Sequence, residues 1–557
     1  MRTNIEIAQE AKCQPIEKVA EGIGLAKEDL QLHGKFTAKV PLEVLRRFDE
    51  RPKGKLILTT AITATPAGEG KTVTTIGLVQ ALGSLDKRVI GALRQPSLGP
   101  VFGVKGGATG GGLSQVYPMW EIDLHFTGDI HAVGAAHNLL SAIIENHIQR
   151  KNGLNIDPTR IIWKKAIDMN CRELRHTVVG LGGRGEGGVP HESGFIITAA
   201  SEISAILALA TSMTDLKERL GQMIVAYTYD KKPVTAAQLG CVGAMALLLK
   251  EAMKPNIVQT LEGQPMFIHG FPFANIAHGN NSILATKYAL KMADYVVTEA
   301  GFATDLGAEK FFDIVCRSSD LRPDCAVLVA SIRALKMHGG CPYDKCDVKN
   351  LAALEKGFPN LDRHIANIGR FGVPVVVAIN NFHTDAAEEA ELIMKHCQAM
   401  GVRCAISFVF ERGGEGGVNL ALEVLDAIEK NQKDFHFLYG DEMSTREKIG
   451  IIAKEIYGAA GVKFDAEAEK DLKNIEAAGH GRLPVCIAKT QHSITDDPKI
   501  KGAPRDWVLT VREINVSAGA GFTVAICGEI MLIPGLPADP NALNMDIGDD
   551  GLIKGLY

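Results

Sequence analysis

Short apolar runs alternate with longer amphipathic segments along most of the chain. The apolar run 55–63 predicts a buried strand, the amphipathic segment 72–85 a helix, and the run 88–93 a second strand. Further runs that we expect to form strands are 177–182, 223–229, 294–301, 326–332, 373–382 and 483–489. Apolar strands separated by helices are typical of parallel sheets joined by helical crossovers, so the sequence predicts an α/β fold. Ligands bind beyond the carboxyl ends of such strands, where many of these runs end in a polar residue or glycine.

The segment TPAGEGKT lies between the first predicted strand and the first predicted helix. It follows the phosphate-loop pattern G-x-x-x-x-G-K-[ST], except that Thr65 stands in place of the first glycine. Backbone N–H groups at a helix start attract anions, Lys71 reaches the terminal phosphates, and the Thr72 hydroxyl ligates magnesium. We therefore predict a nucleotide site and not a plain strand–helix turn. Its expected residues are Thr65, Pro66, Ala67, Gly68, Glu69, Gly70, Lys71 and Thr72, with Thr72 as the metal ligand.

Arg94 ends the next predicted strand, in the segment ALRQPSLGP. A strand-end arginine beside a phosphate loop pairs with a carboxylate or phosphate through two parallel hydrogen bonds. The alternative is a surface salt bridge, but the prolines and glycine that follow favour a site. Phe302 and Phe382 also follow strand ends, and the residues alone leave two interpretations open for them: core packing, or stacking on a flat aromatic ligand.

Other polar residues are weaker candidates. His125, His131 and His137 are spaced six apart, which puts them on different helix faces and argues against a metal site, although His125 and Asp129 remain candidates for a pocket wall. Lys336 and His338 follow a predicted strand, and both a catalytic and a solvated role stay open for them. Zinc at Cys341 and Cys346 is disfavoured because no second ligand pair follows at finger spacing.

Length and composition set the broad class. The 557 residues predict about three domains, since one domain usually takes about 100–200 residues. We expect a large nucleotide-binding domain over 1–300, with a P-loop NTPase-like parallel sheet, and two smaller α/β domains over 301–440 and 441–557. The net charge of −5 gives no electrostatic footprint for nucleic acid or an anionic membrane. Eleven scattered cysteines and the lack of an apolar span of about 20 residues predict a soluble cytoplasmic protein.

Several longer motifs resemble those of the formate–tetrahydrofolate ligase family, and the likeness runs from Ile5 to Tyr557. The motifs are TPAGEGKT, RQPSLGP, GVKGGATGGG, LHFTGDIHAV, PFANIAHG, EAGFATDLGAEKF, RALKMHGG and LIPGLP. The resemblance implies a cytoplasmic homotetramer that uses MgATP and is activated by potassium or ammonium. It implies that formate and tetrahydrofolate are the substrates and that formyl phosphate is the intermediate.

The resemblance also implies roles for single residues. Lys71 and Arg94 would be catalytic, with Arg94 and its neighbour Gln95 at the formate and formyl phosphate site. Phe302 and Phe382 would line the pterin slot, with Phe410 as a further substrate-binding residue. The 301–440 domain would then contribute to the folate pocket.

The chain departs from the family pattern within the glycine-rich and pocket motifs. The departing residues are Gln95, Thr109, Leu113, Phe271, His383, Ala386, Phe410, Glu411 and Arg412. A carboxylate at Glu411 that faced the slot would repel the folate glutamate tail. One alternative is therefore a diverged paralogue that activates another small acid or uses another one-carbon acceptor. A second alternative, from a different class, is a P-loop nucleotide switch.

Overall fold

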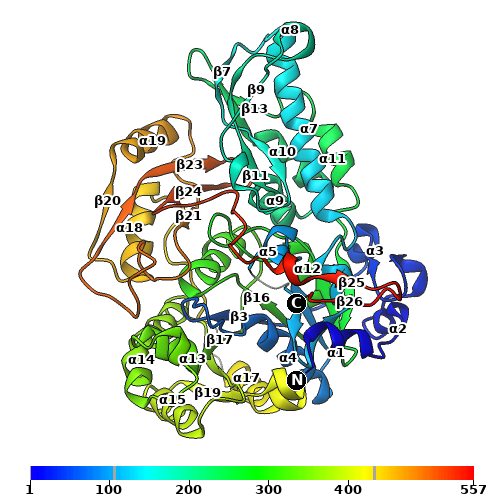
Figure 1. The fold of residues 1–557 in the computed structure, drawn as a ribbon, viewed down its shortest axis with the longest axis vertical. Helices are drawn as coiled ribbons and strands as arrows, with labels where there is room; N and C mark the ends of the chain where they lie inside the picture. Colours follow the sequence, from blue (N-terminus) through cyan, green and yellow to red (C-terminus); the bar gives the residue numbers. More distant parts are fainter. Residues whose placement is uncertain (1, 105–107, 431–433, 557) are drawn as a thin grey trace.

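The structure is a computed structural model that describes residues 2–104, 108–430 and 434–556, and these residues fold around one large sheet (Figure 1). Parallel strands form the centre of this sheet. In spatial order they are β15 (Pro265–Ile268), β4 (Val89–Leu93), β16 (Tyr295–Glu299), β3 (Lys55–Ala61), β17 (Cys325–Ser331), β18 (Val375–Asn380) and β19 (Arg403–Ser407). Beside β15 the sheet continues antiparallel, through β14 (Asn256–Thr260).

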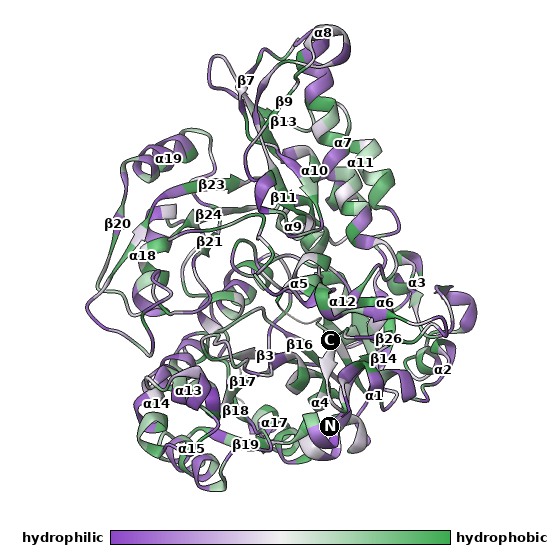
Figure 2. Cartoon of the chain, in the orientation of Figure 1, coloured by the Kyte–Doolittle hydropathy of each residue, from purple (hydrophilic) through white to green (hydrophobic). Residues whose placement is uncertain are grey.

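Helices cover both faces of the parallel strands. Ile57 of β3 packs in one apolar cluster with residues of α4 (Lys71–Ser84) and α17 (Val418–Lys430). Its neighbours Leu56 and Leu58 point to the other face, into a cluster that includes α12 (Ile283–Met292) and α14 (Leu351–Gly369). Burial on both faces explains why these strands read as continuous apolar runs. Figure 2 shows the same contrast, with hydrophobic residues in the central strands and a mostly hydrophilic outer helix α19 (Ala466–Ala477).

The predicted α/β class is confirmed for the centre of the molecule. The runs 55–63, 88–93, 294–301, 326–332 and 373–382 form β3, β4, β16, β17 and β18, and the segment 72–85 forms α4. Two other runs were assigned wrongly to parallel strands. β9 (Thr177–Val179) and β12 (Ile224–Thr228) pair antiparallel with their neighbours, in the arm at the top of Figure 1. A short apolar run indicates a buried strand but not the direction of its partner.

The central sheet continues across residue 300, where we placed a domain boundary. β17, β18 and β19 follow that residue in the sequence, yet β17 pairs directly with β3. The carboxyl-terminal part has its own three-stranded sheet, with β21 (Val485–Ala488), β24 (Phe522–Ile526) and β23 (Glu513–Ser517). The division into 1–300, 301–440 and 441–557 remains a prediction. In the described ranges, none of the helices has both the length and the apolarity of a membrane span.

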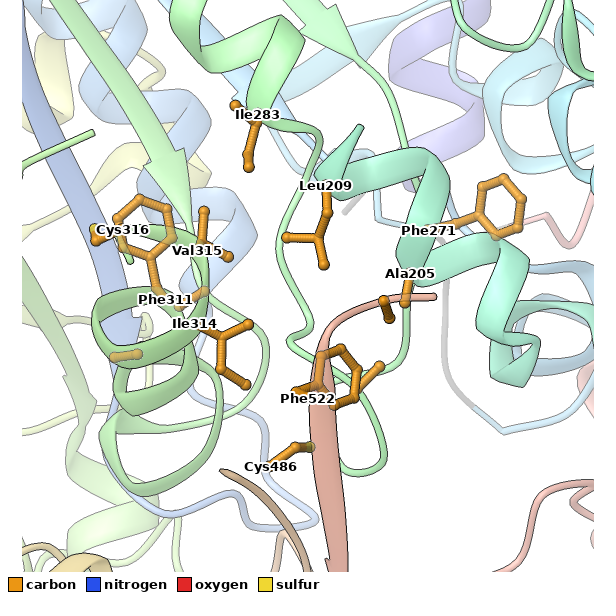
Figure 3. Packing of buried hydrophobic residues seen from close by; sticks show 14 of the residues in the cluster. Ala205, Leu209, Phe271, Ile283, Phe311, Ile314, Val315, Cys316, Cys486 and Phe522 are labelled. Carbon is orange, nitrogen blue, oxygen red and sulfur yellow. The ribbon is translucent and has the colours of Figure 1, made fainter. Parts of the chain in front are cut away.

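One buried apolar cluster joins these parts. Figure 3 shows Phe311, Ile314 and Val315, from the segment after β16, on one side of the cluster, with helix α9 (Glu202–Leu209) and Phe522 of β24 on the other side. Phe522 comes from the carboxyl-terminal sheet and is 1% exposed. Apolar burial therefore fixes the chain that follows β16.

A buried ion pair reinforces this junction. Lys489, just after β21, donates to Asp305 Oδ2 at 2.6 Å and to the Ser493 carbonyl at 2.6 Å. Both charged side chains are almost fully buried, at 0% and 2% exposure. Charges in such surroundings are tolerated because each neutralises the other and both make hydrogen bonds.

Removing one member of this pair should cost more than removing both. Lys489→Met leaves the Asp305 carboxylate buried without compensation, so we expect the free energy of unfolding to fall by about 3–5 kcal/mol. The double variant Lys489→Met/Asp305→Leu should recover most of that loss, because no uncompensated charge remains. Urea denaturation followed by circular dichroism measures both. A single variant within about 1 kcal/mol of the parent would contradict a stabilising role for the pair.

Candidate active site

The predicted phosphate loop connects β3 to α4 at the carboxyl edge of the sheet. Gly68 and Gly70 have φ angles of +74° and +79°, in the left-handed region that favours glycine. A Cβ atom on Gly70 would lie 2.0 Å from Asn380 Nδ2, and that amide donates to the Glu69 carbonyl at 3.1 Å. Asn380 ends β18, so a distant strand fixes the shape of the loop.

Thr65 does not disturb this loop although it replaces the usual glycine. Its φ is not in the left-handed region, so its backbone does not require glycine. The Thr65 N–H and hydroxyl donate to Glu69 Oε1 at 2.7 and 3.1 Å, which closes the loop across its base. Burial raises the pKa of Glu69 to about 7, and the two hydrogen bonds from Thr65 oppose that shift.

The amino terminus of α4 opens onto this loop. Gly70 is its N-cap and supplies no side-chain hydrogen bond. By helix geometry, the first N–H groups of α4 have no acceptor within the helix, and the helix dipole adds positive potential there. An anion such as a phosphate satisfies both conditions.

The carboxylate of Glu299 lies within 4 Å of polar atoms from three other residues of the site. Glu299 is the last residue of β16, which lies between β4 and β3, and its side chain is 2% exposed. The Thr72 hydroxyl donates to Oε2 at 2.9 Å, and Lys71 Nζ lies 3.8 Å from the same oxygen. Arg94 Nη2 lies 3.9 Å from Oε1. Three predicted site residues, Lys71, Thr72 and Arg94, are therefore brought together around one carboxylate.

Arg94 is held in a narrow, mostly buried place, with its side chain 15% exposed. Its Nη1 donates to the Pro272 carbonyl at 3.0 Å. Burial lowers the pKa of Arg94 and the Glu299 carboxylate opposes this shift, so the guanidinium stays charged. Gln95 follows, 3% exposed, with its N–H donating to the Gly270 carbonyl at 2.9 Å. This is a shielded cation at the sheet edge and not a surface salt bridge.

The three predicted aromatic residues lie in different surroundings. Phe302 follows Glu299 by three residues and adopts φ +59°, an unusual value for a bulky side chain. The Phe382 ring lies under the guanidinium of Arg333, 4.6 Å from its centroid. Phe410 packs against the glycine turn at 111–112, where a Cβ on Gly112 would lie 2.0 Å from the Phe410 carbonyl oxygen. The contacts of Phe410 are thus with this turn, and its predicted role in substrate binding remains a proposal.

The weaker candidates have structural partners. Asp129 forms a buried ion pair with Lys39 at 2.7 Å, and Lys336 forms one with Glu389 at 3.0 Å. A solvated role for Lys336 is therefore wrong. His338 Nε2 lies 3.0 Å from the Thr63 carbonyl, and burial lowers its pKa to about 4. Across the described part of the chain, no group of three or more His, Cys, Asp or Glu side chains has the arrangement of a metal site.

The residues that depart from the family pattern lie in varied surroundings. Thr109 donates to the buried Asp123 at 3.1 Å, Phe271 belongs to the core at 2% exposure, and Leu113 pairs through its N–H with the Phe410 carbonyl. His383 and Glu411 are exposed to solvent. Residues 105–107 of the GVKGGATGGG motif lie outside the described residues. Gln95 follows Arg94 in the chain, and Phe271 lies between Gly270 and Pro272, whose carbonyls accept from the Gln95 N–H and from Arg94.

Sequence reasoning missed Glu299 and Asn380. Both are the last residue of a strand, in the motif EAGFATD and the run VVVAINNF. The rule that polar strand ends carry the chemistry pointed to both places. We followed it to the phenylalanines nearby and not to the polar residues themselves.

A glycine-rich loop between strand and helix, a buried carboxylate and a shielded arginine at the carboxyl edge of a parallel sheet are typical of an α/β enzyme. A sequence profile of formate–tetrahydrofolate ligase matches residues 2–557. The chain therefore belongs to the formate–tetrahydrofolate ligase family, whose reaction joins formate to tetrahydrofolate.

The loop geometry predicts the effect of a methyl group at Gly70. Gly70→Ala places a Cβ against Asn380 and imposes a left-handed conformation on an L-residue, so we expect the loop to shift and ATP affinity to fall at least about tenfold. Isothermal titration calorimetry measures this. Gly34→Ala is the matched control, since Gly34 has φ +82° and nothing within 4 Å of its Cβ position. Equal ATP affinity in Gly70→Ala and the parent would contradict the phosphate-loop assignment.

Proposed function

We propose that the protein ligates formate to tetrahydrofolate at the expense of ATP and yields 10-formyltetrahydrofolate, ADP and phosphate through formyl phosphate. The observation that carries the proposal is the convergence of Lys71, Thr72 and Arg94 on Glu299 at the start of α4. This arrangement puts the positive charge of Lys71 where it would bind phosphate, and the separate positive charge of Arg94 beside it, where it would bind a carboxylate. Family membership over residues 2–557 supports the overall reaction.

Both chemical steps balance without help from another reactant. A carboxylate oxygen of formate attacks the γ-phosphorus, the bond to the bridging oxygen breaks, and ADP leaves. The N10 amine of tetrahydrofolate then attacks the formyl carbon, the carbon–oxygen bond to phosphate breaks, and the amine loses its proton. Phosphorylation is needed because a free carboxylate is a poor electrophile and a poor source of a leaving group.

The residues at the loop suit the first step. Phosphoryl transfer depends mainly on positioning and on neutralising the charge that spreads over the phosphoryl oxygens. Lys71, at the start of α4, would neutralise charge on these oxygens during the transfer. The N–H groups of the loop would bind the phosphates. Arg94 would orient formate and then formyl phosphate, since its planar fork matches a carboxylate.

Magnesium fits the same place. Mg²⁺ prefers hard oxygen ligands, and the Thr72 hydroxyl and Glu299 carboxylate lie 2.9 Å apart at the phosphate loop. In P-loop enzymes a threonine or serine of the loop and a carboxylate at the end of a neighbouring strand hold the ion. When bound, it would neutralise phosphate charge. The potassium or ammonium activator and the homotetramer rest on the family resemblance alone.

Tetrahydrofolate would bind over Phe302 and Phe382, which follow the ends of β16 and β18. Aromatic faces of this kind stack on flat rings. Glu411, which would repel folate if it faced the slot, is exposed to solvent, and the paralogue alternative is decided by the experiment below. The nucleotide-switch alternative is set aside, since the family is one of ligases.

Formate-dependent ADP release, measured with and without tetrahydrofolate, tests the proposal. We expect ADP release to require formate, and 10-formyltetrahydrofolate to form when tetrahydrofolate is added.

Lys71→Ala should lower turnover about a hundredfold or more with unchanged circular dichroism, because loss of a charge at the transferring phosphate usually costs that much. ADP release with another small acid but not with formate would favour the paralogue.

A second prediction concerns Glu299 and the metal. Glu299→Gln keeps the size of the side chain and removes its charge, so we expect affinity for Mn²⁺, used in place of Mg²⁺, to fall at least about tenfold in the presence of ADP. ADP affinity without metal should stay equal or improve, since a negative charge near the phosphates is gone. Electron paramagnetic resonance of Mn²⁺ and calorimetry of ADP give the two values.

Glu202→Gln is the matched control for that experiment. Glu202 is a half-buried carboxylate that accepts hydrogen bonds from the main-chain N–H groups of Gly519 and Ala520 at 2.8 and 3.1 Å, away from the loop. It should leave Mn²⁺ affinity unchanged. An equal loss in both variants would mean that general destabilisation, and not ligation, explains the result.

A further inference from the structure

Several buried polar groups lie around Arg94 without a protein partner among the described residues. Both ring nitrogens of His278, both amide atoms of Asn280 and of Gln95, and Nε of Arg94 itself make no hydrogen bond. His278 and Asn280 are 0% exposed. A buried polar group left unpaired destabilises the folded protein, so such a cluster requires an explanation.

The chain path brings these groups to the site already described. Asn280 forms an antiparallel bridge with Ala300, and the Gly301 N–H donates to the Gly279 carbonyl at 3.0 Å. Residues 279–280 therefore run beside the end of β16, next to Glu299. A Cβ on Gly301 would lie 2.4 Å from the Ala274 Cβ and 3.1 Å from Arg94 Nη2, so the wall here is tight.

His278 is neutral and lies within electrostatic reach of two cations. Burial, together with the smaller effect of the charges of Arg94 and Lys310, lowers its pKa to about 3. The main chain of Ala205 and the amide of Asn280 flank the ring, but neither reaches hydrogen-bonding geometry. A neutral imidazole carries one N–H donor, and the Asn280 amide carries two.

The chemistry of the cluster matches a small carboxylate. N–H donors beside a fixed guanidinium favour an anion, and the close approach of Gly301 to Ala274 and Arg94 leaves room only for a small one on that side. A carboxylate accepts several such hydrogen bonds at once. The same donors suit an acyl oxygen, because that oxygen gains negative charge when an amine attacks the acyl carbon.

We propose that His278 and Asn280, together with Arg94, bind formate and hold the oxygen that is not phosphorylated. This inference rests on the proposed function and adds two binding residues to it. The same oxygen remains as the formyl oxygen of formyl phosphate, so one donor set serves both chemical steps. The unpaired donors are kept for the substrate at the expense of stability.

Apolar replacements of similar shape separate this role from a structural one. Asn280→Leu and His278→Phe remove the polar atoms, so stability should stay equal or rise, while the KM for formate should rise about tenfold to a hundredfold. The KM values for ATP and tetrahydrofolate should stay within about twofold. Thermal unfolding and steady-state kinetics of the full-length protein give these values. His278→Gln retains a donor and should keep more formate affinity than His278→Phe.

Tyr457→Phe is the matched control, since its hydroxyl is also buried without a partner but belongs to the carboxyl-terminal part. It should leave the KM for formate unchanged. Folded Asn280→Leu and His278→Phe variants with a formate KM within about threefold of the parent would overturn the inference. If one of them fails to fold, the other and His278→Gln still decide. A parent that releases no ADP with formate would instead overturn the proposed function.

Discussion

The buried carboxylate of Glu299 is the group on which the site depends. A nearly fully buried charge is stable only when opposite charges and hydrogen bonds compensate it, and Lys71, Thr72 and Arg94 supply that compensation. All of them lie at the carboxyl edge of the sheet: Arg94 follows β4, Glu299 ends β16, and Lys71 and Thr72 begin α4, the helix after β3. Since β4, β16 and β3 are neighbours in that order, the strand order itself assembles the site.

Because the site is assembled by the order of strands in the sheet, only its local parts could be predicted from the sequence. The loop before α4 is local, so its position between a strand and a helix could be predicted from the spacing of glycines, Lys71 and Thr72. The ion pair between Lys71 and Glu299 is not local, because Glu299 lies more than 200 residues later in the chain. Nothing in the sequence places β16 between β3 and β4. The buried partner of Lys336 was missed for the same reason, because Glu389 belongs to a separate helix.

The sequence also did not reveal whether a strand pairs parallel or antiparallel with its neighbour. The runs that became β9 and β12 have the same apolar character as the central strands, but their partners are close antiparallel strands. The sequence did not reveal which atoms lie close to the glycines either. Gly70 is required because Asn380 fills the space where its side chain would lie, and Gly112 because the Phe410 backbone does. The aromatic residue at 410 therefore packs on a turn that its motif alone did not reveal.

The segment after Glu299 joins the chemistry to the rest of the fold. Phe302 adopts a left-handed conformation that is unfavourable for a bulky residue, and such strain persists only where the surrounding structure over-determines it. Here the anchors lie on both sides. Glu299 is held by two cations, and the Thr304 hydroxyl meets His364 Nδ1 at 2.6 Å while Asp305 pairs with Lys489.

The other nitrogen of His364 lies 2.9 Å from the Thr63 hydroxyl, at the entrance to the phosphate loop. Burial lowers the pKa of His364 to about 4, so a neutral imidazole links the loop to the segment that carries Phe302. The phosphate site and the aromatic face beside it are therefore parts of one buried network. Under the proposed function, formyl phosphate formed at the loop and a folate ring on Phe302 would share one rigid support, which favours attack of the amine on the formyl carbon.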